Sequence, residues 1–552
     1  MFVFPLLLAG PLDPLTAWDA WPSARYLRTP APCLRHAELM EQIGFLEARH
    51  AGWLRSEQVG QSVEGRPIRL LQLGSGARRV LFWSQMHGDE PSATPALLDL
   101  ADYLLSRAEE PDARSVLEGT TLLMIPMLNP DGAERYSRRN AHGIDVNRDA
   151  LNIATPEGRI LKSVRDRFEP VMGFNLHDQD RRTTVGETGV LATISLLAVA
   201  GDPQGTSTPG KARTKRACSA VVWALGPLIP GGIARYDEDW SPRAFGDNLT
   251  SWGSPVVLIE SGGPPPGSDL ETLTRLNFVA LLGVLRDLVR DDLGGHDPAL
   301  YESLPRNQTR GWADVVIRGG RLWQPGFGAP FRADLAFDLL RDDRLSCGGT
   351  PAGAPASEVV EVGDARFLGA GREVDAAGGT LVPAFVASVR GLEAAEWLTS
   401  TQLQILGRLG VATLLWHLSE TERTHAETLA AHRSSPGGSR IEMVDLGVPL
   451  AWLELDGAVV EPASRTLAAL LDALGAPGWR DVQARSGLDD LLSRLAGPTR
   501  SAVVRPRPVP VLPGTPASVV LLRPTGEEGL DLATATAEKL WIDGVEARGQ
   551  AR

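Results

Sequence analysis

Short apolar runs alternate with helical segments through residues 36–292, and this alternation limits the possible folds more than any other feature of the sequence. Continuous apolar runs are typical of strands that are buried on both faces of a sheet. We therefore expect an α/β fold, with a mixed, mainly parallel sheet and helices on both of its faces. The expected strands are 79–85, 121–127, 171–176 and 255–259, and the expected helices are 37–54, 94–106 and 270–290.

The length of 552 residues indicates more than one domain, because single hydrophobic cores stop growing well below this size. The pattern of expected strands and helices changes after a stretch rich in Gly, Pro, Asn and Asp, and such a composition is typical of a linker. Beyond it, short β signals are split by Gly turns, and 390–500 is Ala/Leu-rich and expected to be helical. We predict an N-terminal extension at 1–35, an α/β domain at 36–292, a linker at 293–311 and a β-rich domain with a helical insert at 312–552.

Charge and cysteine content exclude several classes of function. The net charge of -13 argues against a nucleic-acid partner. The three cysteines are far apart and form no CxxC pair, which excludes a thiolate zinc cluster and a disulfide framework. The apolar first ten residues lack a basic segment and are interrupted by Pro5 and Gly10, so we expect neither a signal peptide nor a membrane partner. A cytoplasmic protein is expected, and a homodimer is compatible with the sequence.

Four clusters of polar residues follow four of the expected strands directly. They are His87–Glu90, Asn129–Gly132, His177–Asp178 and Glu260–Gly263. In open α/β sheets, ligands bind where the carboxyl ends of the strands converge. Because four independent clusters fall at this edge, a functional site is expected there.

Three of these residues suit a metal ion. A catalytic zinc takes three protein ligands from His and carboxylate side chains and keeps an open position. His87 and Glu90 are three residues apart, and His177 follows a different strand. A lone histidine is more often a hydrogen-bonded structural residue, but the chain has only nine histidines and two of them end apolar strands. We therefore predict one zinc ion per chain.

The order of these motifs resembles the zinc carboxypeptidases, the carboxypeptidase A-like (M14-type) metallopeptidases. The matching motifs are HGDE (87–90), NPDG (129–132), SRRNAHGIDVNRD (137–149), LHD (176–178) and IESGG (259–263). The resemblance covers about residues 35–292. It implies a zinc-dependent hydrolase that removes a C-terminal residue from its substrate.

The resemblance also implies roles for single residues around the metal. His87, Glu90 and His177 match the zinc ligands. Glu260 matches the general base that takes a proton from the zinc-activated water and later protonates the leaving amine. Asp145 matches the carboxylate that orients a ligand histidine. Both assignments have a simpler alternative: Asp145 could be a turn residue, and Arg138 could be a solvated surface charge.

Further residues match the part of the family's site that binds substrate. Arg138 matches the arginine that stabilises the oxyanion, and Asn147 and Arg148 match the pair that holds the substrate's terminal carboxylate. The family often has Asn-Arg-Asn where this chain has Asn147–Asp149. Tyr236 is a loose candidate for the tyrosine that closes over substrate. It precedes an acidic loop, which suits either an amino-bearing substrate or a solvated turn.

The C-terminal half resembles the composite β-domain of the amidohydrolases. The matching segments are 313–325, 333–337, 372–388 and 539–547. In that family the last strand leads into a metal-binding HxH motif, whereas here it leads into Ala387–Arg390 without a histidine. The stretch 390–500 is also too short for a complete (β/α)₈ barrel. We therefore expect a degenerate, non-catalytic domain.

Three functions are compatible with these observations. The first is a zinc carboxypeptidase that acts on a peptide or acyl-amino-acid substrate with a free carboxylate. The second is a zinc-dependent amidase or deacylase that acts on cell-wall peptides or acyl amino acids. The third is a binding protein with a decayed site, against which the complete ligand set and Glu260 argue.

Overall fold

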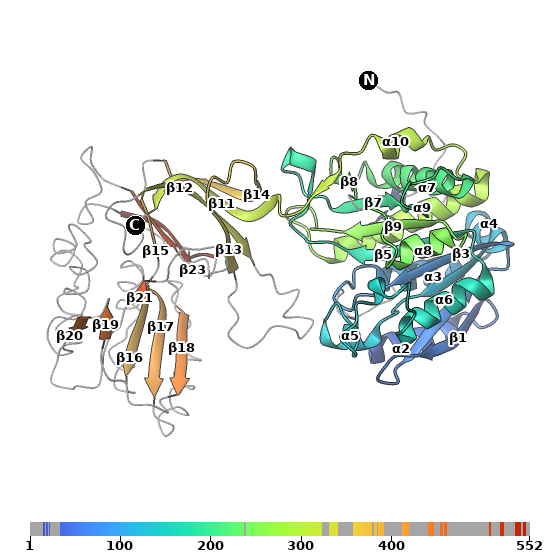
Figure 1. Cartoon of the computed structure of the whole chain (residues 1–552), viewed down its shortest axis with the longest axis horizontal. Helices are drawn as coiled ribbons and strands as arrows, with labels where there is room; N and C mark the ends of the chain where they lie inside the picture. The colour runs from blue at the N-terminus through green and yellow to red at the C-terminus, as the bar shows by residue number, and fades with distance from the viewer. Residues whose placement is uncertain are drawn as a thin grey trace. The chain divides into compact units, whose positions relative to one another are not determined.

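A computed structural model describes residues 34–236, 239–322, 331–339 and 357–377, single positions between 15 and 21, and short strands between 380 and 547. The chain divides into two compact units (Figure 1). The first unit consists of Met1–Trp312 with the short segments 342–352 and 367–369, and the second consists of the rest.

An eight-stranded sheet forms the centre of the first unit, in the order β1-β2-β4-β3-β5-β9-β7-β8. Its neighbours β4, β3, β5 and β9 run parallel, as do β7 and β8, while the other pairs are antiparallel. The predicted mixed, mainly parallel sheet is therefore confirmed. The strands are β1 Leu54–Gln61, β2 Pro67–Leu73, β3 Arg78–Ser84, β4 Thr120–Ile125, β5 Met172–Asp178, β7 Ile194–Ala198, β8 Ile233–Arg235 and β9 Val256–Ser261.

Helices cover both faces of this sheet and form two separate cores. In β3, Val80 and Phe82 belong to one core, and Leu81 and Trp83 to the other, because successive side chains point to opposite faces. The first core includes α2 His36–Arg49, α3 Ala93–Ser106, α4 Pro111–Gly119, α7 Pro209–Leu225 and α9 Glu271–Asp291. The second includes α6 Pro156–Phe168 and α8 Phe245–Ser251. This double burial explains the continuous apolar runs in the strands.

Two local expectations differ from the structure. The helix expected over 37–54 ends at Arg49, and Leu54 already begins β1. The turn expected at 129–132 is the start of a short helix, α5 Pro130–Arg135. Asn129 caps this helix, because its Oδ1 accepts a hydrogen bond of 2.9 Å from Gly132 N.

The segment expected to be a linker is built into the first unit. It contains α10 Pro298–Glu302 and β10 Asn307–Gln308, and β10 pairs with β6 Thr184–Val185. Tyr301 of α10 is buried and accepts a hydrogen bond of 3.1 Å from Ala198 N of β7. The polar residues of this stretch therefore mark a cap and turns within a packed segment.

The part of the N-terminal extension that the structure describes packs on the first core. Trp21 is buried in that core, and its Nε1 donates a hydrogen bond of 3.0 Å to Asp99 Oδ2. The guanidinium of Arg275 lies 3.6 Å from the centre of the Trp18 ring. The described part of the extension is therefore attached to the first unit.

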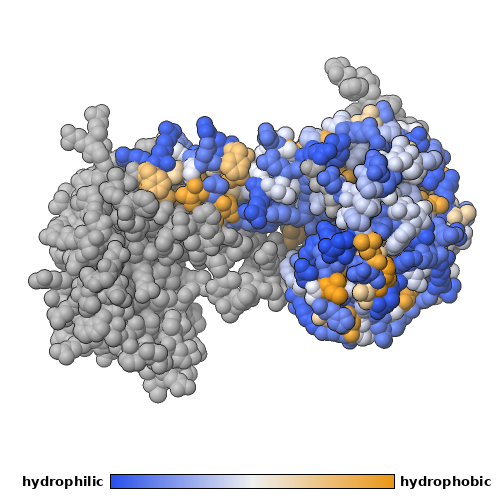
Figure 2. Space-filling model, viewed as in Figure 1, coloured by the Kyte–Doolittle hydropathy of each residue, from blue (hydrophilic) through white to orange (hydrophobic). Residues whose placement is uncertain are grey.

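The surface of the described residues on the face in Figure 2 is mainly hydrophilic, with apolar side chains in small patches. Within the described part of the chain, every helix is too short or too polar to cross a lipid bilayer. The cytoplasmic location expected from the sequence stays a prediction.

The second unit brings the two ends of the C-terminal half into one sheet, in the order β13-β12-β11-β15-β22-β23-β24, with β14 beside β11. Its strands are β11 Trp312–Leu322, β12 Phe331–Leu339, β13 Ser357–Gly363, β14 Gly369–Asp375, β15 Thr380–Pro383, β22 Val519–Arg523, β23 Thr536–Ile542 and β24 Val545–Ala547. A second sheet has the order β18-β17-β16-β21, with β16 Phe385–Arg390, β17 Val411–Leu418, β18 Arg440–Asp445 and β21 Arg507–Pro508.

The structure describes only strands within the stretch 390–500 that was expected to be helical. These are β17 and β18, together with the pair β19 Leu453–Leu455 and β20 Ala458–Val460. The expected helices lie outside the described residues. The resemblance of this unit to the amidohydrolase composite domain stays a prediction.

Candidate metal centre and active site

The four clusters that follow apolar strands lie at one edge of the sheet. Their strands β4, β3, β5 and β9 are direct neighbours and run parallel, so their carboxyl ends meet. His177 of β5 lies directly opposite Glu260 of β9 in the register. The sheet topology therefore brings together residues that are up to 173 positions apart (His87 to Glu260) in the chain.

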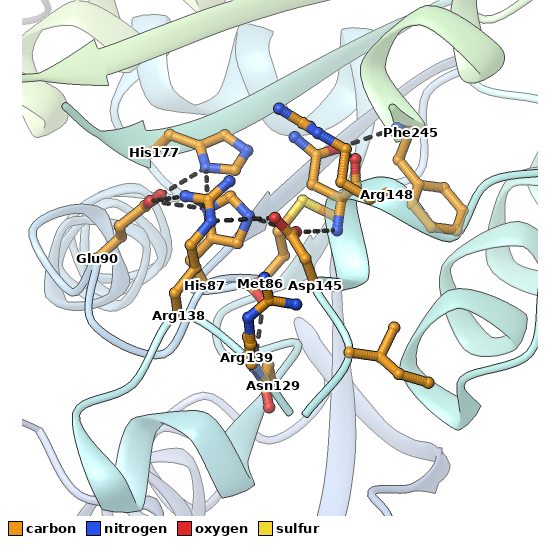
Figure 3. Close-up of polar contacts among 12 residues, drawn as sticks. Met86, His87, Glu90, Asn129, Arg138, Arg139, Asp145, Arg148, His177 and Phe245 are labelled. Atoms are coloured by element: carbon orange, nitrogen blue, oxygen red, sulfur yellow. Dashed lines mark hydrogen bonds and ion pairs between the residues drawn. The ribbon is translucent and has the colours of Figure 1, made fainter. Parts of the chain in front are cut away.

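His87, Glu90 and His177 form a compact buried cluster at this edge (Figure 3). Glu90 Oε1 lies 2.7 Å from His87 Nδ1, and Glu90 Oε2 lies 2.6 Å from His177 Nδ1. The two Nδ1 atoms are 3.1 Å apart. Two imidazole nitrogens and a carboxylate are the donor set of a catalytic zinc site, and they converge on one point. Among the described residues this is the only group of three with such spacing.

Asp145 fixes the orientation of the His87 ring from the opposite side. Its Oδ1 lies 3.0 Å from His87 Nε2, and its Oδ2 accepts a hydrogen bond of 3.0 Å from Arg138 Nε. A proton on Nε2 would be donated to Asp145, which leaves the lone pair of Nδ1 directed at the cluster. Arg138 Nη1 also lies 3.2 Å from Glu90 Oε1, so its positive charge is next to the metal cluster.

The charges of the cluster suit a cation. Burial disfavours the ionised form of Glu90, but His87 and His177 outweigh it and lower the pKa of this carboxyl. Burial also opposes ionisation of Asp145, yet His87 and Arg138 lower its pKa. Burial lowers the pKa of His177, which favours a neutral ring with a free lone pair. Burial has the same effect on His87, but Glu90 and Asp145 outweigh it and raise the pKa of that ring, so a cation at the cluster would have to displace a proton there. A carboxylate and a neutral imidazole are the forms in which these side chains bind metals.

Gly88 lies between two of the cluster residues, where two loops touch. A Cβ atom on Gly88 would lie 1.9 Å from the carbonyl carbon of Gly132. The backbone of Gly88 also donates a hydrogen bond of 3.0 Å from its N to Ser137 O. Only glycine therefore allows the HGDE and NPDG loops to approach this closely.

Gly88→Ala is expected to lower the free energy of unfolding by about 1–3 kcal/mol, because the new methyl group forces the two loops apart. Denaturant unfolding monitored by circular dichroism measures this change. Gly44→Ala is the control, since a Cβ atom at this helical position meets no atom within 4 Å. Equal denaturation midpoints for Gly88→Ala and the unmodified chain would contradict the steric argument.

A cavity of about 690 Å³ opens beside the metal cluster and contains the other predicted site residues. Glu260 lines it and is only 7% exposed. Asn147 and Arg148 line it from the loop that follows Asp145. The Oδ1 of Asn147 accepts a hydrogen bond of 2.9 Å from Phe245 N, which ties this loop to the start of α8. The carboxylate of Glu260 and the guanidinium of Arg148 therefore line one cavity.

Asp149 and Tyr236 are the two positions where this chain departs from the family pattern, and they have different surroundings. Asp149, which replaces the expected asparagine, is buried and accepts hydrogen bonds from Thr155 N (2.8 Å) and Thr155 Oγ1 (2.7 Å). It therefore holds the loop in front of α6. Tyr236 is half-buried and lines the cavity. The first two residues of the acidic loop behind it, Asp237 and Glu238, lie outside the described residues.

The structure adds cavity residues that the sequence analysis missed. Asn175 precedes His177 on β5, and Gln179 follows it. The segment Arg306–Thr309 contributes a wall of the cavity, and Asn307 Nδ2 donates a hydrogen bond of 3.0 Å to Gln179 Oε1. An Asn within an apolar strand, two positions before a ligand, was the one available signal for Asn175. No sequence signal pointed to the segment 306–309.

Part of this chain is similar to known zinc carboxypeptidases. Residues 39–162 match the family model described as zinc carboxypeptidase. The chain is 30% identical over 154 residues to carboxypeptidase 2 of Trichophyton rubrum, which covers 26% of this chain and 28% of that protein. It is also 30% identical over 130 residues to carboxypeptidase SOL1 of Arabidopsis thaliana, covering 20% and 26% of the two chains. A metallo-carboxypeptidase structure from Pseudomonas aeruginosa aligns with 23% identity and a TM-score of 0.37, covering 46% of this chain and 69% of that one.

These matches have a limited span. The chain covers about a quarter of the length of the two curated relatives named above. His87, Glu90, Arg138, Asp145, Asn147 and Arg148 fall within the range matched by the family model. His177 and Glu260 lie beyond it, and only the geometry connects them to the first group.

Proposed function

We propose that this protein is a zinc-dependent carboxypeptidase, which hydrolyses the last peptide or amide bond of a substrate with a free terminal carboxylate. The observation that carries the proposal is the position of the buried His87–Glu90–His177 cluster beside Glu260 and Arg148 in one cavity. A metal cluster, a carboxylate base and a carboxylate-binding cation are the components that this hydrolysis needs.

His87, Glu90 and His177 would hold one zinc ion per chain. Zinc in such a site acts as a Lewis acid and makes water a stronger nucleophile near neutral pH. Asp145 keeps His87 in the tautomer that presents Nδ1, through its contact of 3.0 Å with Nε2. The burial of all three ligands keeps them in one arrangement before substrate binds.

Glu260 acts as the general base in this proposal. It is largely buried, lines the cavity and lies opposite His177 in the sheet, so it can contact a water molecule beside the metal cluster. Its carboxylate takes the proton of the attacking water and returns it to the leaving amine. Arg138 stabilises the negative charge that develops on the carbonyl oxygen, because its guanidinium is already held at the cluster by Asp145 and Glu90.

Arg148 and Asn147 bind the terminal carboxylate of the substrate. An Arg side chain forms two parallel hydrogen bonds with a carboxylate, which fixes both the position and the direction of the last residue. The backbone around Arg148 is held from both sides, since its Nη1 contacts Asn147 O at 2.8 Å and its O accepts from Arg243 Nε at 3.3 Å.

Arg148→Ala is expected to raise KM for free-acid peptides by at least about tenfold, because a charge-assisted hydrogen bond contributes about 1.5–3 kcal/mol. Peptides with an amidated C-terminus lack the charge and should be affected much less. Steady-state kinetics on matched acid and amide peptides measures the difference. Arg139→Ala is the control, because Arg139 is exposed and its Nη1 contacts only the nearby Gly143 O. Equal losses on acids and amides would indicate a structural role for Arg148.

A substrate screen with and without a chelator tests the function itself. Peptides with varied C-termini, their amides, acyl amino acids and γ-glutamyl compounds are offered to the purified protein. Release of the C-terminal residue from free-acid peptides, lost with chelator and restored by zinc, is the expected result. Activity on acyl amino acids or cell-wall peptides alone would favour the amidase alternative. Tight substrate binding without turnover would favour a binding protein.

A further inference from the structure

Asn175 is a buried polar residue in the cavity that the proposed reaction does not use. It lies in the centre of β5, two residues before His177, so both side chains are on the same face of the sheet. Asn175 is only 2% exposed and lines the cavity. It therefore lines the same cavity as a proposed zinc ligand.

The carboxamide oxygen of Asn175 accepts no hydrogen bond from the described residues, although it is completely shielded from solvent. A buried polar atom without a partner is energetically unfavourable. Most buried polar side chains have a partner, and exceptions often have a role in function. Because Asn175 lines the cavity, a ligand bound there is a candidate for the missing donor.

Apolar side chains line the cavity with Asn175, together with the carboxylate of Asp247. Leu197, Val199 and Leu258 line the same cavity, and Leu258 lies opposite Asn175 in the register. Gly246 leaves space there, because a Cβ atom at this position would lie 3.6 Å from Asn175 Nδ2. Aliphatic walls with one carboxamide between them suit a side chain with an apolar stem and a polar, uncharged end.

Asn175 also lies between the metal cluster and the carboxylate-binding loop. On one side it is two residues from His177 on the same strand. On the other side it faces Gly246, and the preceding Phe245 N donates to Asn147 Oδ1 at 2.9 Å. A substrate held by both the metal cluster and the Asn147–Arg148 loop would therefore lie beside Asn175.

We propose that Asn175 determines the side-chain specificity of this site and selects a C-terminal residue with a carboxamide side chain, above all glutamine. The inference rests on the proposed carboxypeptidase function. A carboxamide pairs with Asn175 through two hydrogen bonds, one donated to Oδ1 and one accepted from Nδ2. Its methylene groups contact Leu197, Val199 and Leu258. An anionic end would be desolvated against these three apolar side chains and repelled by Asp247, which lines the same cavity.

Acylated dipeptides that end in Gln, Met, Glu or Lys test the proposal on the zinc-loaded full chain. The unmodified protein is expected to hydrolyse the Gln peptide with a kcat/KM at least about tenfold above that of the Met peptide, which has similar length but no amide. Asn175→Ala is expected to remove this preference by lowering activity on Gln more than on Met. Asn152→Ala is the control, since Asn152 is exposed.

Asn175→Asp provides a second variant of nearly unchanged volume, in case the alanine variant does not fold. The new carboxylate only accepts hydrogen bonds, so activity should fall on Gln and rise on Lys by about tenfold or more. A change in the ratio between substrates separates specificity from a structural role. Equal kcat/KM on Gln and Met in the unmodified protein, or a preference that survives both substitutions, would overturn the inference. Hydrolysis of none of the peptides would overturn the proposed function instead and remove the basis of this inference.

Discussion

Glu260→Gln is expected to lower kcat by about 10²–10⁴-fold while the bound zinc stays near one ion per chain. Glutamine has the same shape as glutamate, but its amide cannot accept the proton of the attacking water. Glu260 lies outside the three-residue metal cluster, so the substitution leaves the proposed ligands intact. Steady-state kinetics and elemental analysis of the same preparation measure the two quantities together.

Glu118→Gln on α4 provides the matched control. It makes the same chemical change at an exposed position away from the cavity. It should leave both kcat and zinc content unchanged. If Glu260→Gln keeps a kcat near that of the unmodified protein, Glu260 is not the base. If the variant loses its zinc as well, Glu260 contributes to metal binding instead.

His177→Ala is expected to remove most of the bound zinc and with it the hydrolytic activity. Two remaining ligands are fewer than the three that catalytic zinc sites use. The loss also leaves Glu90 without its 2.6 Å contact to an imidazole in a buried position. Zinc content after dialysis, measured by mass spectrometry, gives the result, and His142→Ala in an exposed loop position is the control.

Full zinc occupancy in the His177→Ala variant would place the metal elsewhere. The zinc content of His87→Ala then separates two explanations. A loss of zinc means that the other residues of this cluster still hold the metal in His177→Ala, and retention of zinc means that it binds at a separate site. Because residues 312–552 are expected to carry no catalytic metal, zinc that survives both substitutions would contradict the prediction for the C-terminal half as well.

The central strands could be predicted from the sequence because they are buried on both faces. Apolar residues such as those of β3 and β9 allow few alternatives once turns and helices flank them. The strand β1 was missed because its sequence, LRSEQVGQ, is polar and its side chains are only partly buried. β1 is an edge strand of the sheet, so fewer of its side chains need to be apolar.

The candidate metal ligands could be predicted because chemistry requires particular residue types at strand ends. The side-chain contacts of the cavity could not, because they depend on how distant loops pack. In the sequence alone, Asn175 is a polar residue in an apolar strand with no evident role, and only the structure shows that it lines the cavity. The segment 306–309 has the composition of a linker, and its pairing with β6, together with backbone contacts to β8, brings it to the site.

The wall formed by Arg306–Thr309 determines where the chain can be shortened. This segment is fixed to the first unit by backbone hydrogen bonds, in which Arg235 N donates to Pro305 O at 2.8 Å and Gly186 N donates to Arg306 O at 2.8 Å. The first strand of the second unit begins only at Trp312. A protein cut at residue 292, where the last long helix ends, would therefore lose one side of its substrate cavity. Engineers who wish to exchange the second unit for another domain must keep the native chain through Trp312, the last residue of this stretch that belongs to the first unit.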